Sequence, residues 1–421
     1  MKEQFIQRSK EYFKKDYQLF IECLNKPATH GFFLNTKKAS REEILKMLDF
    51  EYEETSLTSS SFYSKTDNIG KTVAYELGLI YPQGIEASLP SLMPDVDSVK
   101  VCLDMCAAPG GKSINILNRL SDDSLLISND YQYKRAQILS SNLERLGFGN
   151  VIITNKDSDT LAKELRNTCD LVVLDAPCSG EGMIRKYPEI LDEWSINNIE
   201  SLASLQSELL ENAYKCLKNN GQILYSTCTF AKEEDENQID SFLKKHPDMY
   251  LVGETKKYSF IDNLEGQFMA LLKRNNSNDT NSRKTKKTIK NQLIDSFIKD
   301  NLDIDEYYLY QNNGHYYLSF IPLFDLGSNV MKYGIYLGDI INNRFEPNHH
   351  LYRVTCLKDK FKYSYSLNDD EYKKYISGLE IRIAKDDHYY LLTYNSYQVR
   401  FGKCSKGQLK NKYPKGLRRM L

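Results

Sequence analysis

Histidine is scarce in this sequence, and its cysteines follow no regular pattern. The 421 residues include 6 histidines and 9 cysteines, and no two cysteines are spaced as CxxC. An odd number of irregularly spaced cysteines is typical of reduced thiols and argues against a disulfide framework. With so few histidines and no paired cysteines, we expect no metal site.

The sequence also lacks long apolar runs and a strong net charge. No apolar run approaches the roughly 18 residues that a membrane helix needs. Residues 1–16, MKEQFIQRSKEYFKKD, lack the apolar centre of a signal peptide. We therefore expect a cytoplasmic protein with no membrane partner. The net charge is −1, but basic residues gather at 273–290 and 401–421. Such runs fit either a solvated linker and tail or local nucleic-acid-binding patches.

From residue 98 onward, the pattern of strand, turn and helix repeats. Apolar runs predict strands that alternate with helices, and hence a mostly parallel sheet covered on both faces. The expected strands are 99–104, 125–130, 151–155, 171–174 and 222–226. The flanking segments differ in composition, and we expect four parts: a small α+β domain at 1–95, the sheet domain at 96–274, a polar linker at 275–292, and a mixed or mostly β domain at 293–421.

A glycine turn and three acids follow strands in this region. DMCAAPGGKS (104–113) joins a strand to a helix, and Gly110 and Gly111 permit a tight turn close to a ligand. The string matches neither a P-loop nor GxGxxG, which disfavours a nicotinamide dehydrogenase, and a purely structural turn remains an alternative. Asp130, Asp157 and Asp175 each end a strand. Acids in such positions can bond a ribose hydroxyl or a base, although helix capping would also explain each of them.

Two cysteines follow two neighbouring strands. Cys178 lies in DAPCSGEGM (175–183) and Cys228 in YSTCTF (225–230). The carboxyl ends of parallel strands converge on one crevice, so we expect the two thiols to lie together beside Asp175. A lone cysteine is usually a small core residue. Two thiols beside an acid and below a glycine turn instead predict covalent chemistry with a cofactor.

These strings together resemble the Sun-type family of RNA cytosine-C5 methyltransferases, which use S-adenosylmethionine. The matching strings are LDMCAAPGGKS, NDYQYKRAQILSSNLERLG, TNKD, DAPCSGEGMIRK, YSTCTF and EGQFMALLKR. RFEPNHHL (344–351) and GQLKNKYPKGLRR (407–419) resemble the C-terminal extension of the branch that includes 16S ribosomal RNA methyltransferase F. The resemblance implies an α/β fold: a Rossmann-like methyltransferase domain with a mostly parallel seven-stranded sheet, a small N-terminal α+β RNA-binding domain and a PUA-like C-terminal RNA-binding domain.

The resemblance also implies a role for each residue. Cys228 would attack C6 of cytosine, Asp175 would hold or protonate N3, and Cys178 would assist removal of the C5 proton and release of the product. Spacing alone does not order the two cysteines, because DNA cytosine-C5 enzymes use the one after the fourth strand. The residues implied for S-adenosylmethionine are Cys106, Ala107, Ala108, Pro109, Gly110, Gly111, Lys112, Asp130 on the ribose, Asp157 near the adenine, Asp175 beside the methionine end, and Arg135 in support. The candidate RNA contacts are Arg185, Lys186, Lys410, Lys412, Lys415, Arg418 and Arg419.

Two N-terminal strings depart from the family pattern. GFFLNTKK places Phe33 where the family usually has arginine, and QGIEAS (83–88) stands where a QEPSAM-like string is usual. Both leave the RNA substrate open. We expect methyl transfer to C5 of a cytosine in RNA, in 16S rRNA or the small ribosomal subunit, with tRNA as the alternative substrate. A non-catalytic RNA-binding assembly factor is the rival class, but such a protein gains nothing from two exposed thiols.

Overall fold

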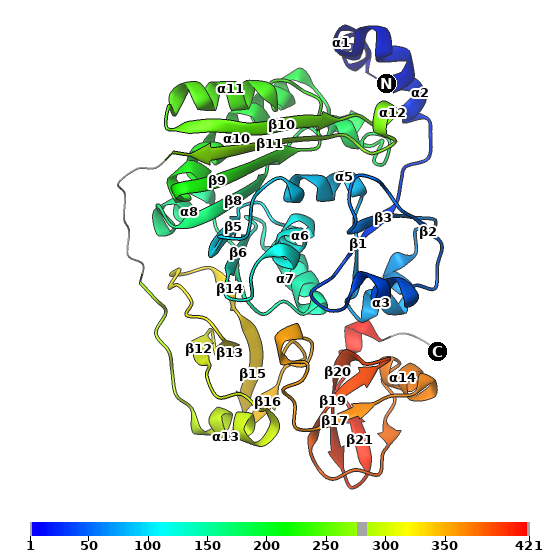
Figure 1. The fold of residues 1–421 in the computed structure, drawn as a ribbon, viewed down its shortest axis with the longest axis vertical. Coiled ribbons are helices and arrows are strands. Elements are labelled where there is room, and N and C mark those ends of the chain that lie inside the picture. Colours follow the sequence, from blue (N-terminus) through cyan, green and yellow to red (C-terminus); the bar gives the residue numbers. More distant parts are fainter. Residues whose placement is uncertain (1, 276–283, 419–421) are drawn as a thin grey trace.

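The computed structural model describes residues 2–275 and 284–418, and its centre is an eight-stranded sheet (Figure 1). In sheet order the strands are β10 (Met249–Lys257), β11 (Gln267–Arg274), β9 (Leu217–Thr227), β8 (Cys169–Asp175), β5 (Val101–Asp104), β6 (Leu125–Asn129), β7 (Val151–Thr154) and β14 (Val330–Tyr333). The run from β9 to β7 is parallel. β11 is antiparallel to both of its neighbours, and β14 is antiparallel to β7.

Helices cover both faces of this sheet, as the alternating pattern predicts. One face carries α6 (Gly111–Arg119) and α7 (Tyr133–Leu146), and the other carries α8 (Ser158–Glu164), α10 (Ile196–Cys216) and α11 (Glu236–Lys245). Successive strand residues point to opposite faces. Cys102 therefore packs in the α6–α7 core, and Leu103 packs in the α8–α10–α11 core. The short helices α9 (Ile190–Glu193) and α12 (Ser259–Asp262) lie in the loops after β8 and β10.

The eighth strand differs from the expected seven. β14 comes from the region after the expected linker, and it pairs with the strand that would otherwise end the sheet. An uncovered edge strand leaves backbone N–H and C=O groups unpaired, and β14 satisfies those of β7. Residues 276–283 of the expected linker lie outside the described residues. The rest is fastened to the C-terminal region, because Lys286 N donates to Leu323 O and Ile289 N donates to Leu309 O.

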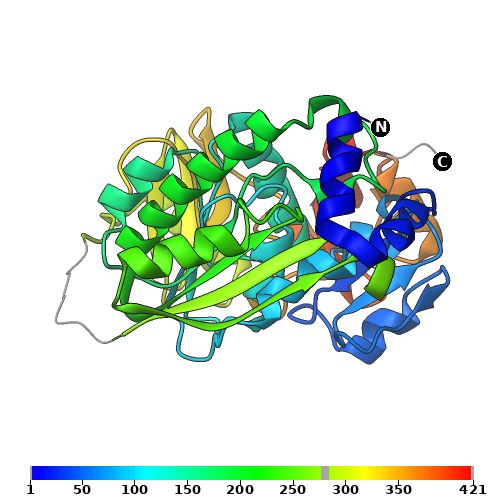
Figure 2. The same ribbon diagram turned by 90° about the horizontal axis from the view of Figure 1, so that it is seen from above.

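The N-terminal region consists of several short helices and a small antiparallel sheet. Its strands, in sheet order, are β2 (Tyr52–Glu53), β3 (Ser61–Ser64), β1 (Gly31–Leu34) and β4 (Ile80–Pro82). Its helices are α1 (Glu3–Phe13), α2 (Tyr17–Leu24), α3 (Arg41–Lys46), α4 (Val73–Glu76) and α5 (Ile85–Ser88). α1 and α2 lie against the sheet domain, at the end of the molecule away from the C-terminal sheets (Figures 1 and 2). Phe5 and Phe20 of these helices share a core with Trp194 and Phe230.

Phe33, the departure from the family pattern, is a core residue in this fold. It is buried in β1 opposite Tyr81 of β4. Its cluster includes Ala107 and Ala108 of the glycine turn. The N-terminal sheet therefore shares a core with the expected cofactor turn, and Tyr81 Oη donates to Pro109 O at 3.5 Å.

The C-terminal region contains two separate sheets. The first has the order β12 (Tyr308–Asn312), β13 (His315–Ser319), β15 (Ile335–Ile341) and β16 (Arg344–Pro347), beside α13 (Gln292–Asn301). The second has the order β17 (Ser364–Ser366), β19 (Tyr389–Tyr394), β20 (Tyr397–Ser405), β21 (Gln408–Asn411) and β18 (Ile381–Arg382), beside α14 (Asp369–Ile376). Across residues 2–275 and 284–418, every helix is too short or too polar to span a bilayer.

Candidate active site

The two predicted cysteines meet at the carboxyl ends of β8 and β9. These strands run parallel with Asp175 opposite Ser226, so the residues that follow leave the sheet at the same edge. The Sγ atoms of Cys178 and Cys228 lie 3.3 Å apart, and the Cys228 N–H points at Cys178 Sγ at 3.3 Å. Both thiols are free and partly exposed. The hydrogen bond with Cys228, together with burial, raises the pKa of Cys178, which favours its protonated form.

Asp175 reaches the same crevice and is held from two sides. Its Oδ2 lies 2.8 Å from Lys112 Nζ, and its Oδ1 accepts a hydrogen bond from Ser226 Oγ at 2.8 Å. Lys112 stands in the first turn of α6 and its side chain is 8% exposed, whereas Asp175 is 38% exposed. The lysine therefore fixes a carboxylate that remains open to a ligand.

A cavity of about 160 Å³ opens beside Asp175 and Lys112. The residues that line it are Tyr81, Pro82, Gln83, Ala87, Asp104, Cys106, Ala107, Ala108, Pro109, Gly111, Lys112 and Asp175. Most of the predicted turn therefore faces it. Burial raises the pKa of the Cys106 thiol, which contributes to this wall as a neutral group.

Five residues of this cavity were missed by the sequence reasoning: Tyr81, Pro82, Gln83, Ala87 and Asp104. Asp104 ends β5, and its Oδ2 accepts from Ser113 Oγ at 2.7 Å, while its buried Oδ1 has no hydrogen-bond partner among the described residues. Burial raises the pKa of Asp104 to about 7. Its place at a strand end is the same signal that selected the other three acids. Tyr81 and Gln83 come from the N-terminal region, and no local pattern marks them as cavity residues.

The backbone of the glycine turn needs Gly110, and Gly111 lies against the end of the Gln83 side chain. Gly110 has a φ of +119°, a conformation that side chains disfavour. A Cβ on Gly111 would lie 2.7 Å from Gln83 Nε2. The turn is braced by Arg135, whose Nη2 donates to Ala108 O at 2.7 Å and whose Nε lies 3.6 Å from Asp130 Oδ2. The structure thus brings Asp130 and Arg135 together at this turn.

Asp157 is placed differently from the other acids. It is the N-cap of α8, where Oδ1 accepts from Thr160 N at 2.8 Å and Oδ2 accepts from Thr160 Oγ1 at 2.9 Å. These hydrogen bonds lower its pKa. The capping role considered from the sequence is therefore present, and a contact with adenine stays a prediction.

Arg185, a candidate RNA contact, is buried in this structure. Its side chain is 1% exposed and forms an ion pair with Glu265, with 2.8 Å between Nη2 and Oε1. It also donates to Leu264 O at 3.1 Å, so the guanidinium fastens the loop after β8 to the residues before β11. The other candidates differ in exposure. Lys410, Lys415 and Arg418 are exposed, Lys186 is half-buried, Lys412 lies 3.5 Å from Glu346, and Arg419 lies outside the described residues.

Comparison with known proteins matches three family models along the chain. Residues 1–85 match the N-terminal domain of 16S rRNA methyltransferase RsmF, residues 91–281 match 16S rRNA methyltransferase RsmB/F, and residues 362–419 match the methyltransferase RsmF PUA domain. A ribosomal RNA small subunit methyltransferase F from Shewanella loihica is 28% identical, over 94% of this chain and 91% of its own. A tRNA (cytosine(49)-C(5))-methyltransferase from Pyrococcus abyssi is 38% identical, over 55% of this chain and 75% of its own.

The chain belongs to the Sun-type family of RNA cytosine-C5 methyltransferases. This confirms the predicted family, the fold, the reaction class and S-adenosylmethionine as cofactor. A crystal structure of a methyltransferase homolog protein from Pyrococcus horikoshii has a TM-score of 0.59 at 26% identity, covering 65% of this chain and 95% of the other. The PUA match falls on the second C-terminal sheet, so the first sheet and β14 are additional to that module.

Proposed function

We propose that this Sun-type methyltransferase modifies C5 of a cytosine in 16S rRNA through a covalent adduct. The observation that carries the proposal is the pair of free thiols 3.3 Å apart, at the strand ends that also present Asp175 and Lys112. Matches to RsmF domains at both ends of the chain favour a ribosomal substrate. Such a substrate would place the reaction in the cytoplasm. A tRNA substrate is the second candidate, supported by the Pyrococcus abyssi relative.

The cavity residues fit S-adenosylmethionine. The unpartnered Oδ1 of Asp104 is a buried acceptor suited to the ammonium group of an amino acid. The backbone from Cys106 to Gly111 would line the cofactor, Asp130 would hold the ribose and Asp157 the adenine. Asp175 would lie beside the methionine end. When bound, the cofactor supplies the methyl group that C5 accepts.

The residues of this chain then have separate tasks. The Cys228 thiolate forms a bond with C6 of a cytosine, and the electron pair of the C5–C6 double bond becomes available at C5. Asp175, held by Lys112 and Ser226, bonds N3 and stabilises the charge that spreads into the ring. After C5 is methylated, its proton leaves with the help of Cys178. The C5–C6 double bond then re-forms, and the bond between Cys228 and C6 breaks. The base must be unstacked for a thiol to reach C6.

Two alanine variants test these tasks. Cys178→Ala should accumulate a covalent protein–RNA adduct on denaturing gels, because methylated product is no longer released. Cys228→Ala should form no adduct and transfer no methyl group. Methylation by Cys228→Ala would show that the two roles are assigned wrongly.

The substrate and the rival class need other measurements. Bisulfite sequencing of total RNA from cells with and without the gene should show one cytosine in 16S rRNA that loses its methyl group. A lost mark in tRNA instead would select the second candidate. If the wild-type protein bound RNA but no S-adenosylmethionine in calorimetry, the non-catalytic assembly role would replace the proposal.

A further inference from the structure

A buried carboxylate, that of Glu234, joins the two cysteine loops. Ser179 follows Cys178 and Thr229 follows Cys228, and their hydroxyl oxygens lie 2.7 Å apart. Glu234 accepts from Ser179 N at 2.9 Å through Oε2, and from Ser179 Oγ through Oε1. The Thr229 hydroxyl can therefore donate to Ser179 Oγ, and Ser179 Oγ donates to Glu234. These hydrogen bonds form one continuous chain across both loops.

Glu234 is fully buried, and its carboxylate is held by hydrogen bonds, with a longer-range attraction to Arg8. In the described part of the chain, no lysine, arginine or histidine forms an ion pair with it. Gln206 of α10 donates to its Oε2 at 2.8 Å and also donates to Pro177 O at 2.8 Å. Burial raises the pKa of Glu234. A buried acid without an ion pair is costly, and every side-chain partner of this one lies on or next to a cysteine loop.

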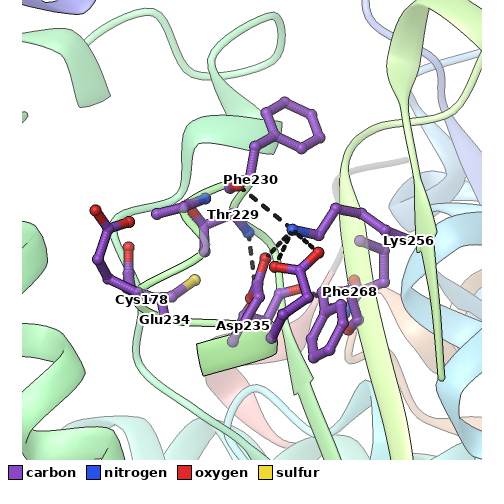
Figure 3. A network of polar contacts seen from close by, with 12 residues as sticks. Cys178, Thr229, Phe230, Glu234, Asp235, Lys256 and Phe268 are labelled. Atoms are coloured by element: carbon purple, nitrogen blue, oxygen red, sulfur yellow. Dashed lines mark hydrogen bonds and ion pairs between the residues drawn. The ribbon is translucent and has the colours of Figure 1, made fainter. Parts of the chain in front are cut away.

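The next residue makes a useful contrast. Asp235 accepts from Thr227 Oγ1 at 2.5 Å and lies 2.8 Å from Lys256 Nζ, and Figure 3 shows the lysine entering from the side away from Cys178. Lys256 comes from β10, so this ion pair fastens the segment to the sheet edge. Asp235 contacts neither Ser179 nor Thr229 in the hydrogen bonds found for it. Glu234 therefore links the two cysteine loops to each other, whereas Asp235 links its segment to the edge of the sheet.

We infer that Glu234 is a positioning residue that sets the separation of Cys178 and Cys228 through Ser179 and Thr229. This inference rests on the proposed roles of the two cysteines. The thiols must stay adjacent because the proton of C5 leaves near Cys178 while Cys228 is still bound to C6. If the loop of Cys178 drifts, the adduct still forms on Cys228 but its breakdown slows.

A matched pair of variants tests the inference. Glu234→Ala removes the link, and we expect adduct to accumulate in the presence of S-adenosylmethionine, with product release slowed on the order of tenfold to a hundredfold. Glu234→Gln should stay within about threefold of wild type. Its amide oxygen can accept from Ser179 N and Gln206, and its NH₂ can donate to Ser179 Oγ, with the hydroxyl chain reversed. Asp235→Asn is the control, expected to lower thermal stability without accumulating adduct.

Each outcome has a defined meaning. Normal turnover without adduct in Glu234→Ala overturns the inference, and so does a Gln variant as defective as the Ala variant, because that would indicate a proton-transfer role. If Glu234→Ala does not fold, Ser179→Ala and Thr229→Val break the same chain singly and should each accumulate adduct. An absence of adduct in Cys178→Ala would instead refute the proposed cysteine roles themselves.

Discussion

The protein buries two polar clusters of opposite charge, at opposite ends of its parallel strands. One is the acidic cluster of Glu234 and Asp235 beside the cysteine loops, at the carboxyl ends of the strands. The other lies around the C-terminal end of α7, and we call it the arginine junction: Glu76, Arg145, Arg353 and Arg400, with Lys38 beside them. The acidic cluster has more buried acids than cations, and the junction has more buried cations than acids.

The junction holds three regions together through one side chain. Arg353, 1% exposed, donates to Arg145 O of α7 at 2.7 Å and to Val399 O of the last sheet at 3.1 Å. It also donates to Glu76 O in the N-terminal region, and its Nη1 lies 3.5 Å from Glu76 Oε1. Burial lowers the pKa of Arg353 to about 10 and lowers that of Lys38 well below its usual range.

The two clusters carry opposite charges because they have different structural roles. A guanidinium presents five N–H donors in a rigid fork and stays charged, which suits the permanent bridging of backbone carbonyls from distant segments. A carboxylate offers acceptors to hydroxyl and amide groups, which suits the fine adjustment of two short loops that carry thiols. We conclude that the junction stabilises the arrangement of domains, while the acidic cluster sets catalytic geometry.

The largest test of this comparison is removal of the bridging arginine. Arg353→Met leaves carbonyls and Glu76 without their partner, and the free energy of unfolding should fall by about 3–5 kcal/mol. Chemical denaturation measures it, with the exposed Arg344→Met as a control that should change stability by less than about 0.5 kcal/mol. The rate of methyl transfer per folded molecule should stay the same as in the wild type. A stable but inactive Arg353→Met would mean that the junction also acts on catalysis.

A second test uses pH, to which the strand-end acids should respond and the arginines should not. Because burial raises the pKa of Asp104 to about 7, only part of it is ionised at neutral pH. If its ionised form holds the cofactor ammonium, affinity for S-adenosylmethionine should rise about tenfold between pH 6 and pH 8. Stability without cofactor should change in the opposite direction, since a raised pKa favours the folded state at low pH and this gain is lost as pH rises toward 7.

Calorimetry across that pH range checks the prediction. Asp104→Asn should flatten the dependence of affinity on pH, whereas Asp157→Asn should leave its slope unchanged, because the exposed cap already has a lowered pKa. An unchanged slope in Asp104→Asn would remove Asp104 from the cofactor site.

The contrast between the two clusters also explains what could be predicted from the sequence. The strand-end residues Asp175, Cys178 and Cys228 lie in short motifs beside apolar runs, so the rule that parallel strands end at one edge brought them together in advance. Glu234 follows Cys228 by six residues, but its partner Ser179 is 55 residues away, and nothing local indicates that contact.

Long-range pairing accounts for the remaining differences. An arginine in a loop motif looks exposed, and the burial of Arg185 depends on Glu265, 80 residues later. Arg353 meets Glu76 across 277 residues. The short run of β14 gives no sign that it will pair with β7. These contacts depend on how whole regions of the protein pack against one another, and this packing cannot be predicted from the periodicity or spacing of residues in the sequence.

The prediction with the smallest expected effect tests whether the N-terminal helices support the cysteine loops. Arg8 of α1 forms two hydrogen bonds with Glu233, at 3.1 and 2.6 Å, and its Nε lies 3.9 Å from Glu181 in the Cys178 motif. Glu233 directly precedes Glu234, so Arg8 links both cysteine loops from outside. Its side chain is 24% exposed and the pair is partly screened by solvent, so Arg8→Gln should cost at most about 1 kcal/mol of stability.

The substitution should affect turnover as well as stability. We expect product release in Arg8→Gln to slow by about two- to fivefold, with adduct detectable, because the loops lose an outer support while Glu234 remains. Lys10→Gln, exposed on the same helix, is the matched control and should leave both quantities unchanged. A double-mutant cycle with Glu233→Gln separates the ion pair from other losses. If Arg8→Gln destabilised the protein as much as Arg353→Met, α1 would belong with the arginine junction as a support of the fold, and the division between the two clusters would not hold.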